Sequence, residues 1–184
     1  MAIKTFTAGS VLTASDTNTF LANSGLVYVK SQTVGSGVSS VTISDCFSAT
    51  YDNYKIIWNG GTMSDTTAMT LQLGAVTSGY YGVLLYGTVA TPGPLATSSN
   101  NTANWTYGGG GNPDQAFVNC DVLNAYSGRK MLQSSISYGA TVAGAMGFHQ
   151  GWTTFSTVCT SLKLQPASGT MTGGTITVYG YRKA

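Results

Sequence analysis

From residue 26 onward, apolar and polar side chains alternate with a period of two, the spacing of a β-strand that covers one of its faces. Met69, Leu71 and Leu73, for example, alternate with Thr70 and Gln72. We expect strands in the following ranges: 26–33, 41–43, 54–58, 69–73, 81–85, 116–123, 131–138, one or two within 152–164, and 176–181. About eight to ten short strands with frequent turns are typical of an all-β, antiparallel sandwich or barrel, and we favour a jelly roll.

The charge content argues against a helical alternative. Charged residues make up 8% of the chain, against about 25% in an average protein, and all six acidic residues are aspartates. Helical proteins usually carry glutamate and lysine on their outer faces, because both residues favour helices. The free-energy cost of desolvation in an assembly is also small for a surface that carries few charges. Two interpretations stay open: a surface that is simply rich in serine and threonine, and a protein that works inside an oligomer.

Residues 1–25 differ from the rest, so we predict an N-terminal attachment segment at 1–25 and a β-sandwich domain at 26–184. The run Thr13-Ala14-Ser15-Asp16 is typical of a capping box, in which the first side chain accepts a hydrogen bond from the backbone three residues on. A short helix would then continue to about Asn23. Such a helix is too short to be stable alone, so it must pack on its own domain or on a partner protein. We favour the partner, with these attachment residues: Phe6, Val11, Leu12, Asp16, Phe20 and Leu21.

Glycine clusters are interpreted as turns. Asn59-Gly60-Gly61 is expected to end the strand that contains Trp58, and 147–151 is expected to be a turn. Residues 87–115 break the strand rhythm with prolines and four consecutive glycines, and therefore form either a long functional loop or a strand between two loops.

Three aromatic residues lie in glycine-rich surroundings: Trp105, Tyr107 and Trp152. Tyr and Trp provide rigid contact area with one polar group, so these three are candidate surface contacts for protein or glycan. The alternative is core packing, which we expect for Tyr54 and Trp58.

The sequence offers little for catalysis or cofactors. A nucleophilic triad would have to use His149, the only histidine, and no clustered ligand set for a metal appears. We therefore expect no enzyme activity and no cofactor. The three cysteines form no CxxC pair, and Cys120 fits a small core residue. Scattered basic residues argue against nucleic acid as a partner, and the chain lacks both a long apolar stretch for membrane insertion and an apolar signal region at its start.

Three short stretches resemble a known group of proteins. Residues 6–18, from Phe6 through Ala8-Gly9 and Leu12-Thr13-Ala14 to Asp16 and Asn18, resemble the F-x-A-G-x-x-L-T-A-x-D-x-N start of many bacteriophage tail and virion proteins. Residues 173–181 resemble the G-S-x-I-x-L-Y-G close of small phage β-domains, with Val178 where leucine is frequent, and 51–56 resemble their Y-x-x-Y-x-I strand.

The resemblance covers under a fifth of the chain and carries no catalytic residues. It implies a virion structural protein made in the bacterial host cytoplasm, with other virion proteins as partners and a homotrimeric assembly. We rank a tail-attached fibre or receptor-binding component first, with a host-surface glycan as a possible ligand. The alternatives are a capsid cement or decoration protein or head fibre, and a free carbohydrate-binding module.

Overall fold

The computed structural model describes residues 7–16, 25–90, 93–140 and 145–183, and the observations below concern these residues. They form a nearly all-β structure in which every paired strand is antiparallel, together with one short helix, α1 (Ala14–Asp16). The strands are β1 (Leu26–Thr33), β2 (Val41–Ile43), β3 (Asn53–Met63), β4 (Thr67–Leu73), β5 (Tyr80–Thr88), β6 (Leu95–Thr102), β7 (Trp105–Gly111), β8 (Ala116–Leu123), β9 (Leu132–Ala140), β10 (Ala145–Thr153), β11 (Leu162–Pro166), β12 (Met171–Thr172) and β13 (Thr175–Tyr181).

Eight of these strands form a jelly roll. The first four strands of the chain pair with later strands in reverse order, β1 with β13, β2 with β11, β3 with β8, and β4 with β7. The resulting sheets have the orders β1-β13-β3-β8 and β2-β11-β4-β7, and they join where β7 pairs with β8. Two sheets wound in this way are the defining topology of a jelly roll, so the predicted fold class is confirmed.

The core lies between the two sheets. β3 contributes Tyr54, Ile56 and Trp58, which point inward at every second position and are fully buried. They meet side chains such as Leu71 of β4 and Leu164 of β11 in one continuous cluster. The predicted core packing of Tyr54 and Trp58 is therefore confirmed.

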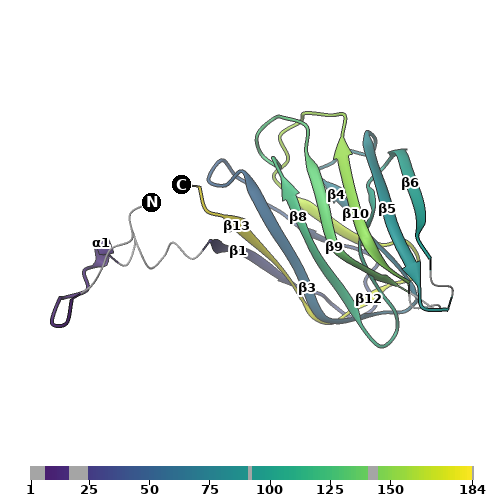
Figure 1. Cartoon of the computed structure of the whole chain (residues 1–184), viewed down its shortest axis with the longest axis horizontal. Coiled ribbons are helices and arrows are strands. Elements are labelled where there is room, and N and C mark those ends of the chain that lie inside the picture. Colours follow the sequence, from purple (N-terminus) through teal and green to yellow (C-terminus); the bar gives the residue numbers. More distant parts are fainter. Residues whose placement is uncertain (1–6, 17–24, 91–92, 141–144, 184) are drawn as a thin grey trace.

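Two inserted hairpins enlarge the first sheet. β5 and β6 lie in the connection between β4 and β7, and β9 and β10 lie in the connection between β8 and β11. The four strands continue the sheet beyond β8 in the order β9-β10-β5-β6, and Figure 1 shows them on the side away from β1. We call these four strands the extension.

The glycine-rich segment 87–115 contains two strands, β6 and β7. The four glycines 108–111 belong to β7, between β4 and β8, and are not a loop. A Cβ atom at Gly109 would lie 2.5 Å from the carbonyl oxygen of Phe117, and one at Gly111 would lie 2.6 Å from the Cβ of Ala116. Side chains have no room here, so glycine reflects the close approach of neighbouring strands.

Two other turn predictions are wrong for a related reason. β3 does not end at Asn59-Gly60-Gly61 but continues to Met63, with an irregular register between Trp58 and Gly61. Residues 147–151 are the middle of β10, where Gly147 and Gly151 flank three larger residues. Gly60 has a φ of +72°, which favours glycine, whereas a Cβ atom at Gly61, Gly147 or Gly151 would collide with neighbouring atoms.

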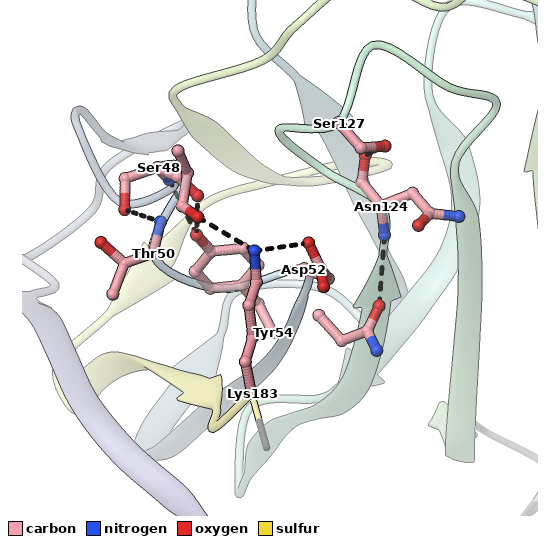
Figure 2. A network of polar contacts seen from close by, with 9 residues as sticks. Ser48, Thr50, Asp52, Tyr54, Asn124, Ser127 and Lys183 are labelled. Carbon is pink, nitrogen blue, oxygen red and sulfur yellow. Dashed lines mark hydrogen bonds and ion pairs between the residues drawn. The ribbon is translucent and has the colours of Figure 1, made fainter.

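The end of the sandwich next to the C-terminal strand is closed by a polar network, shown in Figure 2. Lys183 forms an ion pair with Asp52, 2.8 Å away, and donates to the carbonyl of Ala49. The hydroxyl of Tyr54 bonds to both the backbone N–H and the carbonyl of Ser48. These contacts fix the loop before β3 and account for the polar residues gathered there.

Candidate functional site

The three aromatic residues predicted as surface contacts have different environments. Trp105 is fully buried, so its prediction as a surface contact is wrong. Its indole packs edge-on against Tyr80 and lies beneath Gly151, where a Cβ atom would come within 2.5 Å of the ring. The indole fits inside the sandwich because β10 has a glycine opposite it.

Tyr107 is partly exposed, and its ring packs edge-on against His149 with 5.6 Å between the ring centroids. Part of the Tyr107 ring therefore packs on a buried residue, and only the rest of the ring is available for a surface contact.

Trp152 lies at the surface, with 42% of the residue exposed. Its ring stacks on Tyr81 of the adjacent strand at a centroid distance of 5.0 Å, and the ammonium of Lys130 lies 5.4 Å from the ring centroid. A shallow hollow of about 360 Å³ lies beside this pair, lined also by polar residues that include Asn100 and Gln150. An aromatic surface next to amide groups is chemically suited to a polar ligand or to a protein contact.

The outer face of the extension carries the largest group of exposed apolar side chains on the described sheets. We call it the outer apolar face and define it by these residues: Tyr81, Val83, Leu85, Leu132, Met146, Phe148 and Trp152. Phe148 is 64% exposed and Met146 63% exposed. The register places Phe148 opposite Leu85 and Trp152 between Tyr81 and Leu132, so the side chains form neighbouring pairs. Among the predicted site residues, only Trp152 belongs to this face.

The inner face of the extension buries Tyr80 and Leu84 of β5, and beside them it carries glycines and polar side chains. Gly82, Gly147 and Gly151 face inward, and a Cβ atom at Gly82 would collide with the ring of His149. His149 Nδ1 donates to Gln133 Oε1 at 2.5 Å, Gln133 Nε2 donates to Ser135 Oγ at 2.8 Å, and Ser135 Oγ donates to the carbonyl of Gly108 at 2.9 Å. All three side chains are buried.

Burial lowers the pKa of His149 from about 6.5 to about 4, because the charged imidazolium would lose its hydration. The imidazole is therefore neutral near pH 7. With its partners, it forms a structural link between β10 and β9.

The cysteines have the environment of core residues. Cys46, Cys120 and Cys159 are all free and buried, as predicted for Cys120. Burial raises the pKa of Cys46 and Cys120 to about 12 and that of Cys159 to about 11. All three are therefore protonated thiols near pH 7, a weakly nucleophilic form.

The described part of the chain contains no group of three or more His, Cys, Asp or Glu side chains placed to hold a metal ion. No helix in those same residues is long and apolar enough to cross a membrane.

The described part of the N-terminal segment, residues 7–16, has local structure of its own. Ser10 N–H donates to the carbonyl of Thr7 in a tight turn, and Asp16 N–H donates to Thr13 Oγ1 at 3.1 Å. Thr13 N–H donates in return to the Asp16 carboxylate, so the predicted capping box is confirmed.

Between the turn and the capping box, Val11 is 82% exposed and Leu12 is also exposed. Figure 1 shows this segment apart from both sheets, on the side of the molecule where β1 and β13 lie. The other predicted attachment residues, Phe6, Phe20 and Leu21, lie outside the described residues.

No protein-family model and no curated protein matches the sequence. The solved structures that it matches include that of the infectious bursal disease virus Gt strain, with 7% identity and a TM-score of 0.14 over 85% of this chain and 40% of that one. The crystal structure of the infectious bursal disease virus VP2 subviral particle gives 8% identity and a TM-score of 0.14 over 84% and 39% of the two chains. The chain thus spans about two fifths of those proteins, and such low scores carry no argument about its function.

Proposed function

We propose that the protein is a non-enzymatic structural component of a bacteriophage particle. Its N-terminal segment attaches it to the tail, and the β-sandwich faces outward as part of a fibre or receptor-binding assembly. The resemblance of residues 6–18 to the start of phage tail and virion proteins motivates this assignment. The same resemblance implies a homotrimer.

The observation that carries the proposal is the pair of exposed apolar residues in the N-terminal segment. Val11 and Leu12 lie between a hydrogen-bonded turn and a capping box, so the backbone around them is locally ordered. Both side chains nevertheless face solvent. Leaving ordered aliphatic side chains in water forgoes about 25 cal/mol per Å² of burial, which a partner surface would recover.

The chemistry of the sandwich supports a non-enzymatic role. The imidazole of His149 is buried and bonded to Gln133, and the three thiols are buried and protonated near pH 7. Catalysis needs such groups within reach of a substrate.

We expect the double variant Val11→Asp/Leu12→Asp to keep the melting temperature of the sandwich and to lose incorporation into particles. Two aspartates would have to be desolvated at the docking surface. Immunoblotting of purified particles measures incorporation, and thermal denaturation of the soluble protein measures the fold. Removal of residues 1–25 should give the same two results.

Val158→Asp is the matched control, because Val158 is an exposed aliphatic residue in the connection between β10 and β11. Normal incorporation of the N-terminal double variant would contradict the proposal, as would unfolding of the sandwich when residues 1–25 are removed.

The position in the particle has an alternative, since a cement or decoration protein or a head fibre could use the same segment to join the capsid. Particles that lack tails distinguish the two. Retention of the protein on tail-less heads would assign it to the capsid, and its loss would assign it to the tail.

A free carbohydrate-binding module is the second candidate function. The hollow beside Tyr81 and Trp152, with the amides of Asn100 and Gln150, favours it. This candidate predicts glycan binding that Trp152→Ala abolishes, together with absence of the protein from purified particles. A glycan array followed by calorimetry tests the first point.

A further inference from the structure

The extension carries large apolar side chains on both of its faces. Its inner face buries Tyr80 and Leu84 beside glycines and a polar network, and its outer face exposes a second set of apolar side chains. In β10 the inward positions include Gly147, His149 and Gly151, while Met146, Phe148 and Trp152 point outward. Single exposed apolar residues are common, but contiguous groups of this kind mark interaction sites.

The group is continuous across three strands. Phe148 pairs with Leu85 on β5, and Trp152 pairs with Tyr81 on β5 and with Leu132 on β9. Val83 lies opposite Gln150 and fills the position between these pairs. The face therefore offers a sheet surface suited to face-to-face packing against another sheet, in which side chains of the two layers interdigitate.

The area is close to that of a stable interface. An aromatic side chain presents about 150–250 Å², so the exposed parts of the seven residues total on the order of 600 Å². Intervening polar residues such as Ser98, Ser134 and Gln150 raise this toward the roughly 800 Å² that each partner contributes to a standard interface.

The charge distribution indicates which partner fits. The outward positions of β5, β9 and β10 that the structure describes carry no acidic or basic side chain, and Lys130 lies only at the rim, over Trp152. A charged partner would find no opposite charge on this face. A second copy presents the same uncharged apolar surface, so two copies bury it without leaving a charge unpaired.

We infer that the outer apolar face is the surface through which copies of this chain associate. The inference deepens the proposed function and rests on it for the expectation of a multi-copy assembly. The interface uses the inserted hairpins and leaves the N-terminal segment free. That segment adjoins β1, which lies at one edge of the first sheet, whereas the extension forms the opposite edge (Figure 1).

The test compares the full chain with the double variant Leu85→Asp/Phe148→Asp by sedimentation velocity at tens of micromolar protein. We expect the wild-type mass to be a multiple of 19.0 kDa and the variant mass to be that of one chain. Tyr28→Asp is the control, because Tyr28 is exposed on β1 at the opposite edge of the sheet, and this variant should keep the wild-type mass. A monomeric wild-type chain, or a variant with the wild-type mass, would overturn the inference.

Hydroxyl-radical footprinting of the wild-type chain gives a second readout that does not depend on folding of the variant. Met146, Phe148 and Trp152 should become protected as the protein concentration rises, while Tyr28 stays reactive. Equal reactivity at all concentrations would contradict self-association. Protection by an added glycan, with the mass still that of one chain, would instead make the face a glycan site and overturn the inference.

Particle incorporation separates this inference from the proposed function. Wild-type chain that self-associates through this face but is absent from particles would refute only the proposed function. Wild-type chain that is present in particles but shows no protection of the face would refute only the interface.

Discussion

At the scale of single residues, the buried network of His149, Gln133 and Ser135 could not be predicted from the local sequence pattern. These three residues are separated by up to 16 positions in the chain and meet only because β9 pairs with β10. A lone histidine among glycines fits a turn as well as a strand, so its burial depends on tertiary neighbours that a local pattern does not contain.

The network gives the protein a sensitivity to acid. The pKa of His149 is about 4 in the folded chain and near 6.5 when it is unfolded, so the unfolded chain binds more protons between these values. The free energy of unfolding should therefore fall as the pH drops from about 6.5 to 4, by about 3 kcal/mol from this residue. Urea titrations at fixed protein concentration across this range measure the effect.

The control is His149→Asn, which keeps a donor for Gln133 but does not titrate. It should be less stable than the wild-type chain at pH 7, with a smaller loss of stability on acidification. The same pH dependence in the variant and the wild-type chain would show that His149 does not contribute.

The mistaken surface prediction for Trp105 has a clear physical cause. It rests on the glycine-rich surroundings of Trp105, because glycine usually marks turns. In the structure, the glycines make room for other groups, as Gly151 does for Trp105 and Gly109 does for the backbone of β8. Glycine is required at these positions because another group packs against the backbone there. Which group packs there depends on the fold and cannot be found from the local sequence.

At the scale of elements, alternation located several strands well. β1 and β8 have the predicted bounds, 26–33 and 116–123. β10 was missed, because its glycines hid the alternation. For β5 the alternation found the strand, but it could not show that Tyr81, Val83 and Leu85 point away from the core, since an interface face and a core face share the same pattern.

A contact between three neighbouring strands leads to a testable prediction about the pKa of Tyr181. Asp121 of β8 lies 3.5 Å from Lys55 of β3 and accepts a 2.6 Å hydrogen bond from the hydroxyl of Tyr181 on β13. Burial, aided by that bond and by the charge of Asp121, raises the pKa of Tyr181 to about 12. Asp121→Asn should lower the pKa of Tyr181, because the negative charge beside the phenol is removed.

Ultraviolet titration of tyrosine ionisation follows this change, with Tyr181→Phe identifying the signal. Since the pKa is raised above its usual value of 10, the contact stabilises the fold below pH 10 and the benefit is lost as the pH approaches 12. An unchanged titration in Asp121→Asn would contradict the assigned contact.

At the scale of the whole molecule, the jelly roll separates two surfaces. β1 and β13 are paired at one edge of the first sheet, where the N-terminal segment leaves the sandwich. The extension and its outer apolar face lie at the other edge. A particle protein can therefore attach through one end while copies of the chain associate through the other, without competition for the same residues.

The sequence predicted the sandwich class and the start of β1, but not the extension. The extension arises from two hairpins inserted at separate points of the chain, between β4 and β7 and between β8 and β11. Their pairing through β5 and β10 is a long-range contact without a local signature.

The most direct test of the account is cryo-electron microscopy of the intact phage particle that carries this chain. We predict density for the sandwich outside the tail, with residues 1–25 inserted into a neighbouring protein and the outer apolar faces of adjacent copies in contact. Density on the capsid shell would contradict the tail assignment. Absence of the chain from the particle would contradict the proposed function itself.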